Sequence, residues 1–237
     1  MKKFIGALFA LSLLSGCASV ATTGRPADYY SNQPSQNQDG SPLFSSEGVG
    51  LSDKDIARVL SYRLSLPKIN RIAILNLTKN DYWRHYSNDF VQLNDEVVDS
   101  FVNRLKASHR VYDASFLPSL LVPSNKTVPF LRVAAARYQA DLLLVYRSKC
   151  QSFEKYKFID PNITKAYCSI EAVLLDTRTG IVPFTMASTN EYTATKQDSD
   201  VNFRETIQKA ELKSITKGLG EIAKNLVSFI EQTPVLK

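Results

Sequence analysis

Cysteine and histidine have the widest chemical repertoire of the side chains in this sequence, and the chain has only three cysteines and two histidines. They are Cys17, Cys150, Cys168, His85 and His109. Their spacing forms no CxxC pair and no HExxH zinc motif, and the chain contains no GxSxG nucleophile elbow or glycine-rich phosphate loop. The sequence therefore predicts no catalytic residues, no metal site and no bound cofactor.

The first cysteine, Cys17, directly follows a segment with the pattern of a short export signal. Two lysines precede an apolar run at residues 4–14, which is well short of the roughly 18 to 20 residues that span a bilayer. Residues 14–17 read Leu-Ser-Gly-Cys, which resembles the lipobox in which a cysteine thiol receives diacylglycerol. We expect residues 1–16 to be removed and Cys17 to carry the covalent lipid. An ordinary signal peptide that happens to end in cysteine is the alternative.

The residues after this cysteine indicate the membrane in which the protein is anchored and how the domain is attached to it. Ala18 stands where lipoproteins retained in the inner membrane often carry aspartate, so the resemblance implies an outer-membrane protein that faces the periplasm. Residues 18–50 are mostly small, polar or proline residues, a composition with little apolar surface to bury. We expect residues 17–50 to be the lipidated cysteine and a flexible tether, followed by one globular domain at residues 51–237.

The charge distribution bears on the partners of this domain. The whole chain has a formal net charge of +6, and the expected signal segment contains two of the lysines. The remaining basic residues are scattered among acidic ones instead of forming a basic run, so we expect no nucleic acid partner. The expected contacts are the membrane, through the lipid anchor, and an unidentified protein of the cell envelope.

The two remaining cysteines predict a disulfide and a strand register. In the oxidising periplasm, such a pair is more often a disulfide than a metal or redox site. If Cys150 and Cys168 are directly opposed in an antiparallel hairpin, Arg147 faces Glu171, which is the opposite-charge pairing that adjacent strands favour. The same register places apolar pairs on the other face, Tyr146 with Ala172 and Leu144 with Leu174.

Two aromatic-rich segments lack the periodicity of buried elements and are candidate contact surfaces. One is a loop at residues 82–86, and the other is the expected hairpin tip at residues 152–162. Aromatic and arginine side chains often anchor protein interfaces, although these residues could instead pack beneath their own loops. The candidate residues are Tyr82, Trp83, Arg84, His85, Tyr86, Phe153, Tyr156 and Phe158.

Hydrophobic periodicity predicts the order α-β-α-β-α-β-β-β-α for the elements that carry these residues. The expected helices begin at Ser52 and then cover residues 90–105, 127–138 and 212–229. The expected strands cover residues 71–77, 110–114, 142–150, 165–175 and 181–195, with a turn ending at Gly180 before the last one. This order predicts an α/β (α+β) domain in which helices flank a mixed parallel and antiparallel sheet in three layers.

Three segments, taken in order, resemble a known superfamily. They are Arg-Ile-Ala-Ile-Leu at residues 71–75, the helix-to-strand step at residues 138–145, and the strand end and turn at residues 174–180. Together they resemble the superfamily that contains the TolB amino-terminal domain, the curli secretion lipoprotein CsgG and the penicillin-binding-protein activator LpoB, over residues 69–231. The resemblance implies a non-catalytic regulatory or interaction module of an envelope machine, such as a cell-wall synthase.

Two other functions stay open at this point. One is a subunit of a secretion or surface-appendage assembly, as the likeness to CsgG implies. Membrane-spanning hairpins of that kind need an uninterrupted apolar face, whereas the expected tip here is charged and contains Pro161, which argues against a pore. The other is a hydrolase of envelope polymers, for which the sequence supplies no recognisable catalytic group.

Overall fold

The computed structural model describes residues 30–31, 52–78 and 87–236. The helices are α1 (Asp53–Ser61), α2 (Asn88–Lys106), α3 (Val128–Arg137) and α4 (Phe203–Gln232), with a 3-10 turn at Ser119–Leu121. The strands are β1 (Tyr30–Ser31), β2 (Asn70–Asn76), β3 (Val111–Phe116), β4 (Leu142–Lys155), β5 (Ile163–Asp176) and β6 (Phe184–Thr195). The expected signal segment, Cys17 and the aromatic loop at residues 82–86 lie outside the described residues.

The strands form one mixed sheet in the order β3-β2-β4-β5-β6. Strand β2 is parallel to both β3 and β4, whereas β4, β5 and β6 form an antiparallel meander. The short strand β1 pairs separately with the far end of β4. This arrangement confirms the expected α/β domain with a mixed sheet, and no helix in the described ranges is long and apolar enough to cross a membrane.

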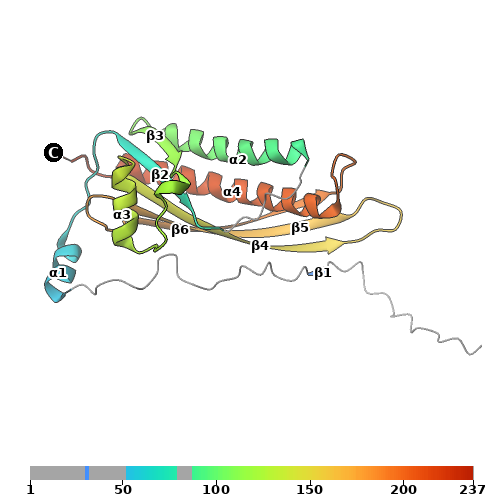
Figure 1. Ribbon diagram of the computed structural model, residues 1–237, viewed down its shortest axis with the longest axis horizontal. Coiled ribbons are helices and arrows are strands. Elements are labelled where there is room, and N and C mark those ends of the chain that lie inside the picture. Colours follow the sequence, from blue (N-terminus) through green and yellow to red (C-terminus); the bar gives the residue numbers. More distant parts are fainter. Residues whose placement is uncertain (1–29, 32–51, 79–86, 237) are drawn as a thin grey trace, which may run out of the picture.

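The helices cover the two faces of the sheet unequally. Figure 1 shows α2 and α4 on one face and α3 on the other. Alternate residues of β2 therefore enter different cores, with Ile72 and Ile74 packed on the α2 and α4 side and Ala73 and Leu75 on the α3 side. Strand β2 is buried on both faces, as its continuous apolar run predicts.

The β4–β5 hairpin is the longest paired unit of the sheet and has the expected register. Cys150 lies opposite Cys168, and Arg147 lies opposite Glu171 with 2.8 Å between Nη2 and Oε2. The turn after β5 closes at Gly180, whose φ of 77° is a conformation that glycine adopts without strain. The apolar pairs are also those expected, Tyr146 with Ala172 and Leu144 with Leu174.

The hairpin extends further than the sequence pattern indicated. Strand β4 continues to Lys155 and β5 begins at Ile163, so the connecting tip is residues 156–162 and not 152–162. The added residues are polar but alternate between buried and exposed positions, and Ser152, Glu154 and Thr164 are buried. A pattern of apolar residues cannot reveal a strand whose buried positions carry hydroxyl and carboxyl groups.

Helix α1 begins where expected but packs differently from the other helices. The Ser52 hydroxyl caps it by accepting a hydrogen bond of 3.2 Å from the Asp55 amide. Its apolar residues Ile56, Val59 and Leu60 share one face, yet no residue of α1 is buried. Figure 1 shows α1 at one end of the longest axis, with the β4–β5 turn at the other end.

Candidate functional site

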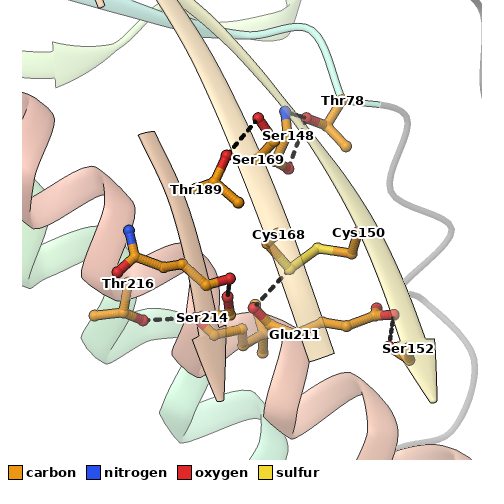
Figure 2. Close-up of a disulfide and its surroundings, with 12 residues drawn as sticks. Thr78, Ser148, Cys150, Ser152, Cys168, Ser169, Thr189, Glu211, Ser214 and Thr216 are labelled. Carbon is orange, nitrogen blue, oxygen red and sulfur yellow. Dashed lines mark hydrogen bonds between the residues drawn. A yellow bond between two sulfur atoms is a disulfide. The ribbon is translucent and has the colours of Figure 1, made fainter. Parts of the chain in front are cut away.

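A disulfide joins the two strands of the long hairpin near the middle of their length. Cys150 and Cys168 are bonded, with their Cα atoms 4.1 Å apart, as the sequence predicted. Figure 2 shows Glu211 of α4 reaching the strands beside the disulfide, where it accepts a 2.7 Å hydrogen bond from the Ser152 hydroxyl. The disulfide and α4 therefore hold the outer half of the hairpin in a fixed position relative to the core.

The Glu211 carboxyl has a raised pKa. Burial raises its pKa, and the hydrogen bond from Ser152 and the charge of Arg204 offset that effect only in part. Burial disfavours the charged form of a carboxyl group unless hydrogen-bond donors such as hydroxyl groups stabilise it, and it therefore favours protonation. We assign it a structural role because its partners are a strand and a neighbouring helical residue.

The three aromatic candidates of the hairpin occupy different environments. Phe153 packs edge-on against Tyr167 of β5, with ring centroids 5.8 Å apart. Tyr156 packs against Phe203 at the start of α4, with centroids 5.4 Å apart, and its hydroxyl donates to Glu154, which raises the Tyr156 pKa. Phe153 and Tyr156 therefore each contact a neighbouring ring, but Tyr156 keeps 60% of its surface exposed, so both remain candidate contact residues.

The apex of the hairpin presents two apolar side chains that do not pack on the domain. Phe158 has a relative exposure of 104% and Ile159 one of 92%. The sequence pattern identified Phe158 but missed Ile159, because a single aliphatic residue in a charged turn gives no periodic signal. A contiguous pair of fully exposed large apolar residues is suited to burial against another surface.

The turn that carries this pair is internally bonded. The amide of Lys157 donates to Oδ1 of Asn162 at 3.0 Å, and the Lys157 ammonium lies 3.3 Å from Asp160. The carbonyl of Asn162 accepts from the amide of Lys196 at 2.8 Å, which connects the turn to the residue after β6. These bonds hold the backbone of the turn that carries Phe158 and Ile159.

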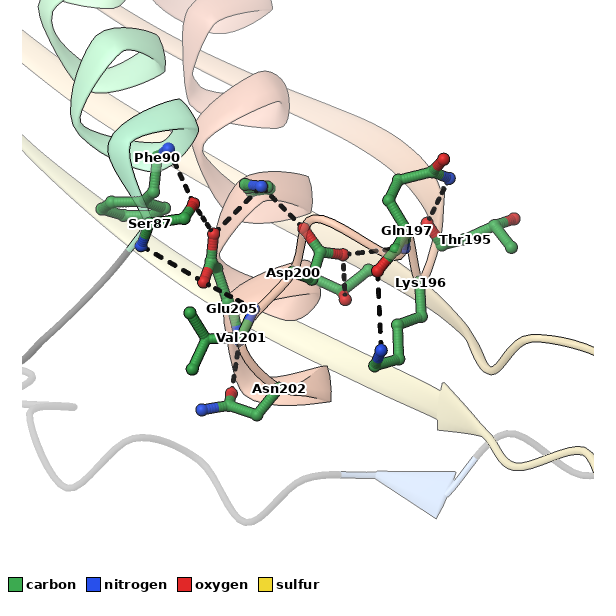
Figure 3. A network of polar contacts seen from close by, with 11 residues as sticks. Ser87, Phe90, Thr195, Lys196, Gln197, Asp200, Val201, Asn202 and Glu205 are labelled. Carbon is green, nitrogen blue, oxygen red and sulfur yellow. Dashed lines mark hydrogen bonds and ion pairs between the residues drawn. The ribbon is translucent and has the colours of Figure 1, made fainter.

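A second polar cluster joins the N-termini of α2 and α4, as shown in Figure 3. The Ser87 hydroxyl accepts from the Phe90 amide at 3.2 Å, capping α2, and donates to Glu205 of α4. Lys209 lies 3.0 Å from Glu205 and 2.6 Å from Asp200, and both carboxylate side chains are almost fully buried. The cluster fixes the position at which the chain enters α2 after residues 79–86.

The charges in this cluster stabilise one another. Burial alone would raise the pKa of Asp200 and Glu205, but the hydrogen bonds that they accept outweigh it and hold both pKa values below their usual range. Burial would lower the pKa of Lys209, yet its bonds to the two carboxylates raise it. No expectation from the sequence included this cluster, although Asn202 and Glu205 have the spacing of a capping box, which could have revealed part of it.

Within residues 30–31, 52–78 and 87–236, no group of three or more His, Cys, Asp or Glu side chains is placed to hold a metal ion. His109 is exposed, with Nδ1 3.6 Å from Glu231. A surface hollow along α2 is lined by Asn88, Val91, Gln92, Asp95, Glu96 and Asp99.

No protein family model and no curated protein matches this sequence. Among solved structures, the chain is similar to a homolog of the neuraminyllactose-binding hemagglutinin from Helicobacter pylori, with 8% identity, 73% of this chain and 93% of that chain covered, and a TM-score of 0.43. It is also similar to PelC from Paraburkholderia phytofirmans, with 16% identity, coverages of 68% and 90%, and a TM-score of 0.35.

A third similar structure is a lipoprotein from Neisseria meningitidis, with 13% identity, 69% of this chain and 99% of that chain covered, and a TM-score of 0.31. Identities and TM-scores of this size establish neither a family nor a function for the present chain. The resemblance to the superfamily of TolB, CsgG and LpoB therefore stays a prediction from the sequence.

Proposed function

We propose that this protein is an outer-membrane lipoprotein, anchored through Cys17, whose domain is a non-catalytic contact module for another protein of the cell envelope. The observation that carries the proposal is the pair Phe158 and Ile159, fully exposed at the apex of a braced hairpin. Its finer form is control of an envelope enzyme such as a cell-wall synthase, which the resemblance to LpoB favours.

The construction of the hairpin supports a role in binding. Burial of apolar surface contributes about 25 cal/mol per Å², so two large side chains with full exposure can contribute several kcal/mol to an interface. Association loses less free energy to conformational ordering when the contact residues are already fixed. The Cys150–Cys168 disulfide, the Ser152–Glu211 hydrogen bond and the bonded turn fix them before any partner arrives.

The chemistry of the cysteines supports the envelope location. A disulfide between Cys150 and Cys168 persists in an oxidising compartment, and residues 1–16 have the pattern expected of an export signal that precedes a lipid-bearing Cys17. Two or more acyl chains on one cysteine give an attachment that is stable over the lifetime of the protein, because each buried CH₂ contributes about 0.8 kcal/mol.

The anchor is tested by Cys17→Ser in cells that carry the otherwise unchanged gene. The variant lacks the thiol that accepts lipid, so we expect it to stay uncut or to appear soluble in the periplasm after membrane fractionation. The matched control is the double variant Cys150→Ala/Cys168→Ala, which loses two thiols but should still sediment with the outer membrane. Sedimentation of Cys17→Ser with the outer membrane, as for the wild type, would refute the lipid anchor.

A further inference from the structure

On the side away from β5, the outer half of β4 pairs with no strand from residues 52–78 or 87–236. Strand β2 pairs with β4 only over residues 142–146, and the Ser148 amide donates to the Thr78 hydroxyl at 2.8 Å just beyond that pairing. Because backbone groups alternate in direction along a strand, those of Cys150, Ser152 and Glu154 point to the same edge as those of Ser148. An edge of this kind is a template for strand addition.

A segment of the same chain already lies on this edge. Strand β1 pairs antiparallel with β4, with Tyr30 opposite Glu154 and Ser31 opposite Phe153. In the sequence, prolines 26 and 34 flank this segment. Proline has no N–H to donate to a ladder, so the sequence confines strand addition to residues 27–33.

We infer that docking of β1 on β4 makes the β4–β5 turn, and not the α1 end, the membrane-proximal end of the domain. The inference rests on the proposed lipid anchor. Tyr30 is thirteen positions after Cys17, and even a fully extended chain of that length reaches only about 45 Å. The paired residue Glu154 lies at the foot of the turn, so the anchor restrains that turn most closely.

Without the pairing of β1 with β4, the tether would favour a different orientation of the domain on the membrane. It would then enter the domain at Ser52, the cap of α1, which is thirty-five positions after Cys17 and within an extended reach of about 120 Å. Figure 1 shows α1 and the β4–β5 turn at opposite ends of the longest axis, so the two attachments favour opposite orientations. With β1 docked, Phe158 and Ile159 face the membrane surface, and their partner must present its site there.

The strand pairing is tested first by a cross-strand disulfide. Ser31 and Phe153 are a non-hydrogen-bonded pair, the same type of position as Cys150 and Cys168, whose Cα atoms are 4.1 Å apart. In full-length protein from cells, Ser31→Cys/Phe153→Cys should form an intramolecular bond, detected by peptide mapping without reduction. The control Ser31→Cys/Gln151→Cys places the thiol two residues along the same face and should form far less.

The cross-linking experiment can either support or overturn the inference. Preferential bonding of residues 31 and 153 within one chain supports the inference. Bonding between two chains would show that a second copy occupies the edge, and equal bonding with residue 151 would show that no fixed register exists. Either of these results overturns the inference, as does the absence of any bond between positions 31 and 153.

The orientation is tested by energy transfer from tryptophan to dansyl-phosphatidylethanolamine in vesicles of phosphatidylethanolamine and phosphatidylglycerol. Lipidated full-length protein carries Trp83→Phe to remove the native donor, together with Ile159→Trp or Leu60→Trp. Both positions are exposed, at 92% and 73%, so neither substitution disturbs the core. We expect stronger transfer from position 159 than from position 60.

A third substitution links this orientation to the docked strand. Tyr30→Pro removes the amide that faces Glu154, so it should abolish or reverse the stronger transfer from position 159 than from position 60. Equal transfer without Tyr30→Pro, or stronger transfer from position 60, would overturn the inference. Failure of the unsubstituted protein to stay on the vesicles would instead refute the lipid anchor, which separates the two claims.

Discussion

Lys209 forms an ion pair with Glu205 one turn earlier in α4, with 3.0 Å between Nζ and Oε1. The same ammonium lies 2.6 Å from Asp200, in the loop that precedes the helix. Because Glu205 also accepts a hydrogen bond from Ser87, the pair connects the first turn of α4 to the cap of α2. One lysine thus pairs with two buried carboxylates at the junction of α2 and α4.

Removal of this lysine should destabilise the domain. Lys209→Met leaves Asp200 and Glu205 buried without a counter-charge, a change that typically costs about 3 to 5 kcal/mol. For a domain of this size, each kcal/mol lowers the Tm by roughly 2 to 4 °C. The control is Lys224→Met in the exposed part of α4, which should leave the Tm almost unchanged. Equal Tm values for the two variants in thermal unfolding would disprove the role of the cluster.

The same cluster predicts a loss of stability in acid. The folded pKa values of Asp200 and Glu205 are lowered, so their contribution is present above their unfolded values of about 4 and is lost as the pH falls through the folded values. Urea unfolding between pH 6 and pH 3 should therefore show a steeper decline for the wild type than for Asp200→Asn. Parallel declines for the two proteins would contradict this assignment.

The disulfide should contribute measurably to stability. The bond closes a loop with a sequence separation of 18, which in the chain-entropy model contributes about 3 kcal/mol. Cys150→Ala/Cys168→Ala should lower the free energy of unfolding by about that amount. In the wild type, thiol labelling after denaturation without reduction should find both cysteines blocked. Two reactive thiols in protein from the periplasm would show that the bond does not form in the cell.

The order of elements and the β4–β5 register could be predicted from the sequence. Apolar periodicity marked the helices and strands, and one register placed Cys150 opposite Cys168 and Arg147 opposite Glu171. Such constraints act between strands that are adjacent in sequence, so a single sequence contains them. The Ser87–Glu205 contact spans 118 positions and involves ordinary polar residues, so no local pattern indicates it.

The two ends of the long hairpin show where sequence patterns fail. In the outer part of β4, Ser152 and Glu154 are buried, although polar residues of this kind are typical of loops. The pairing of Tyr30 and Ser31 with β4 is made by backbone groups and leaves no signal in a segment that was expected to be a flexible tether. Within the hairpin, the sequence could not distinguish Phe158 at the apex, which is exposed, from Phe153 in β4, which packs on Tyr167.

Because Phe153 packs on Tyr167 and Phe158 is exposed, we expect their substitutions to affect stability to different extents. Phe153→Ala removes the packing against Tyr167 and should lower the free energy of unfolding by about 1 to 2 kcal/mol, less than the 3 to 5 typical of a fully buried phenylalanine. Phe158→Ala removes a side chain with no packing on the domain and should change stability by less than about 0.5 kcal/mol. Chemical unfolding of both variants decides the matter, and a larger loss for Phe158→Ala would show that the apex is a packing cluster.

Photo-crosslinking in living cells tests whether the hairpin apex contacts another envelope protein. A photoreactive phenylalanine analogue replaces Phe158 at the apex or, as the control, the exposed Leu60 of α1. We predict a discrete protein adduct from position 158 that position 60 does not give, and that Ile159→Asp abolishes without a change in Tm. A folded, membrane-anchored protein that gives no protein adduct from position 158, or the same adducts from both positions, would contradict the account.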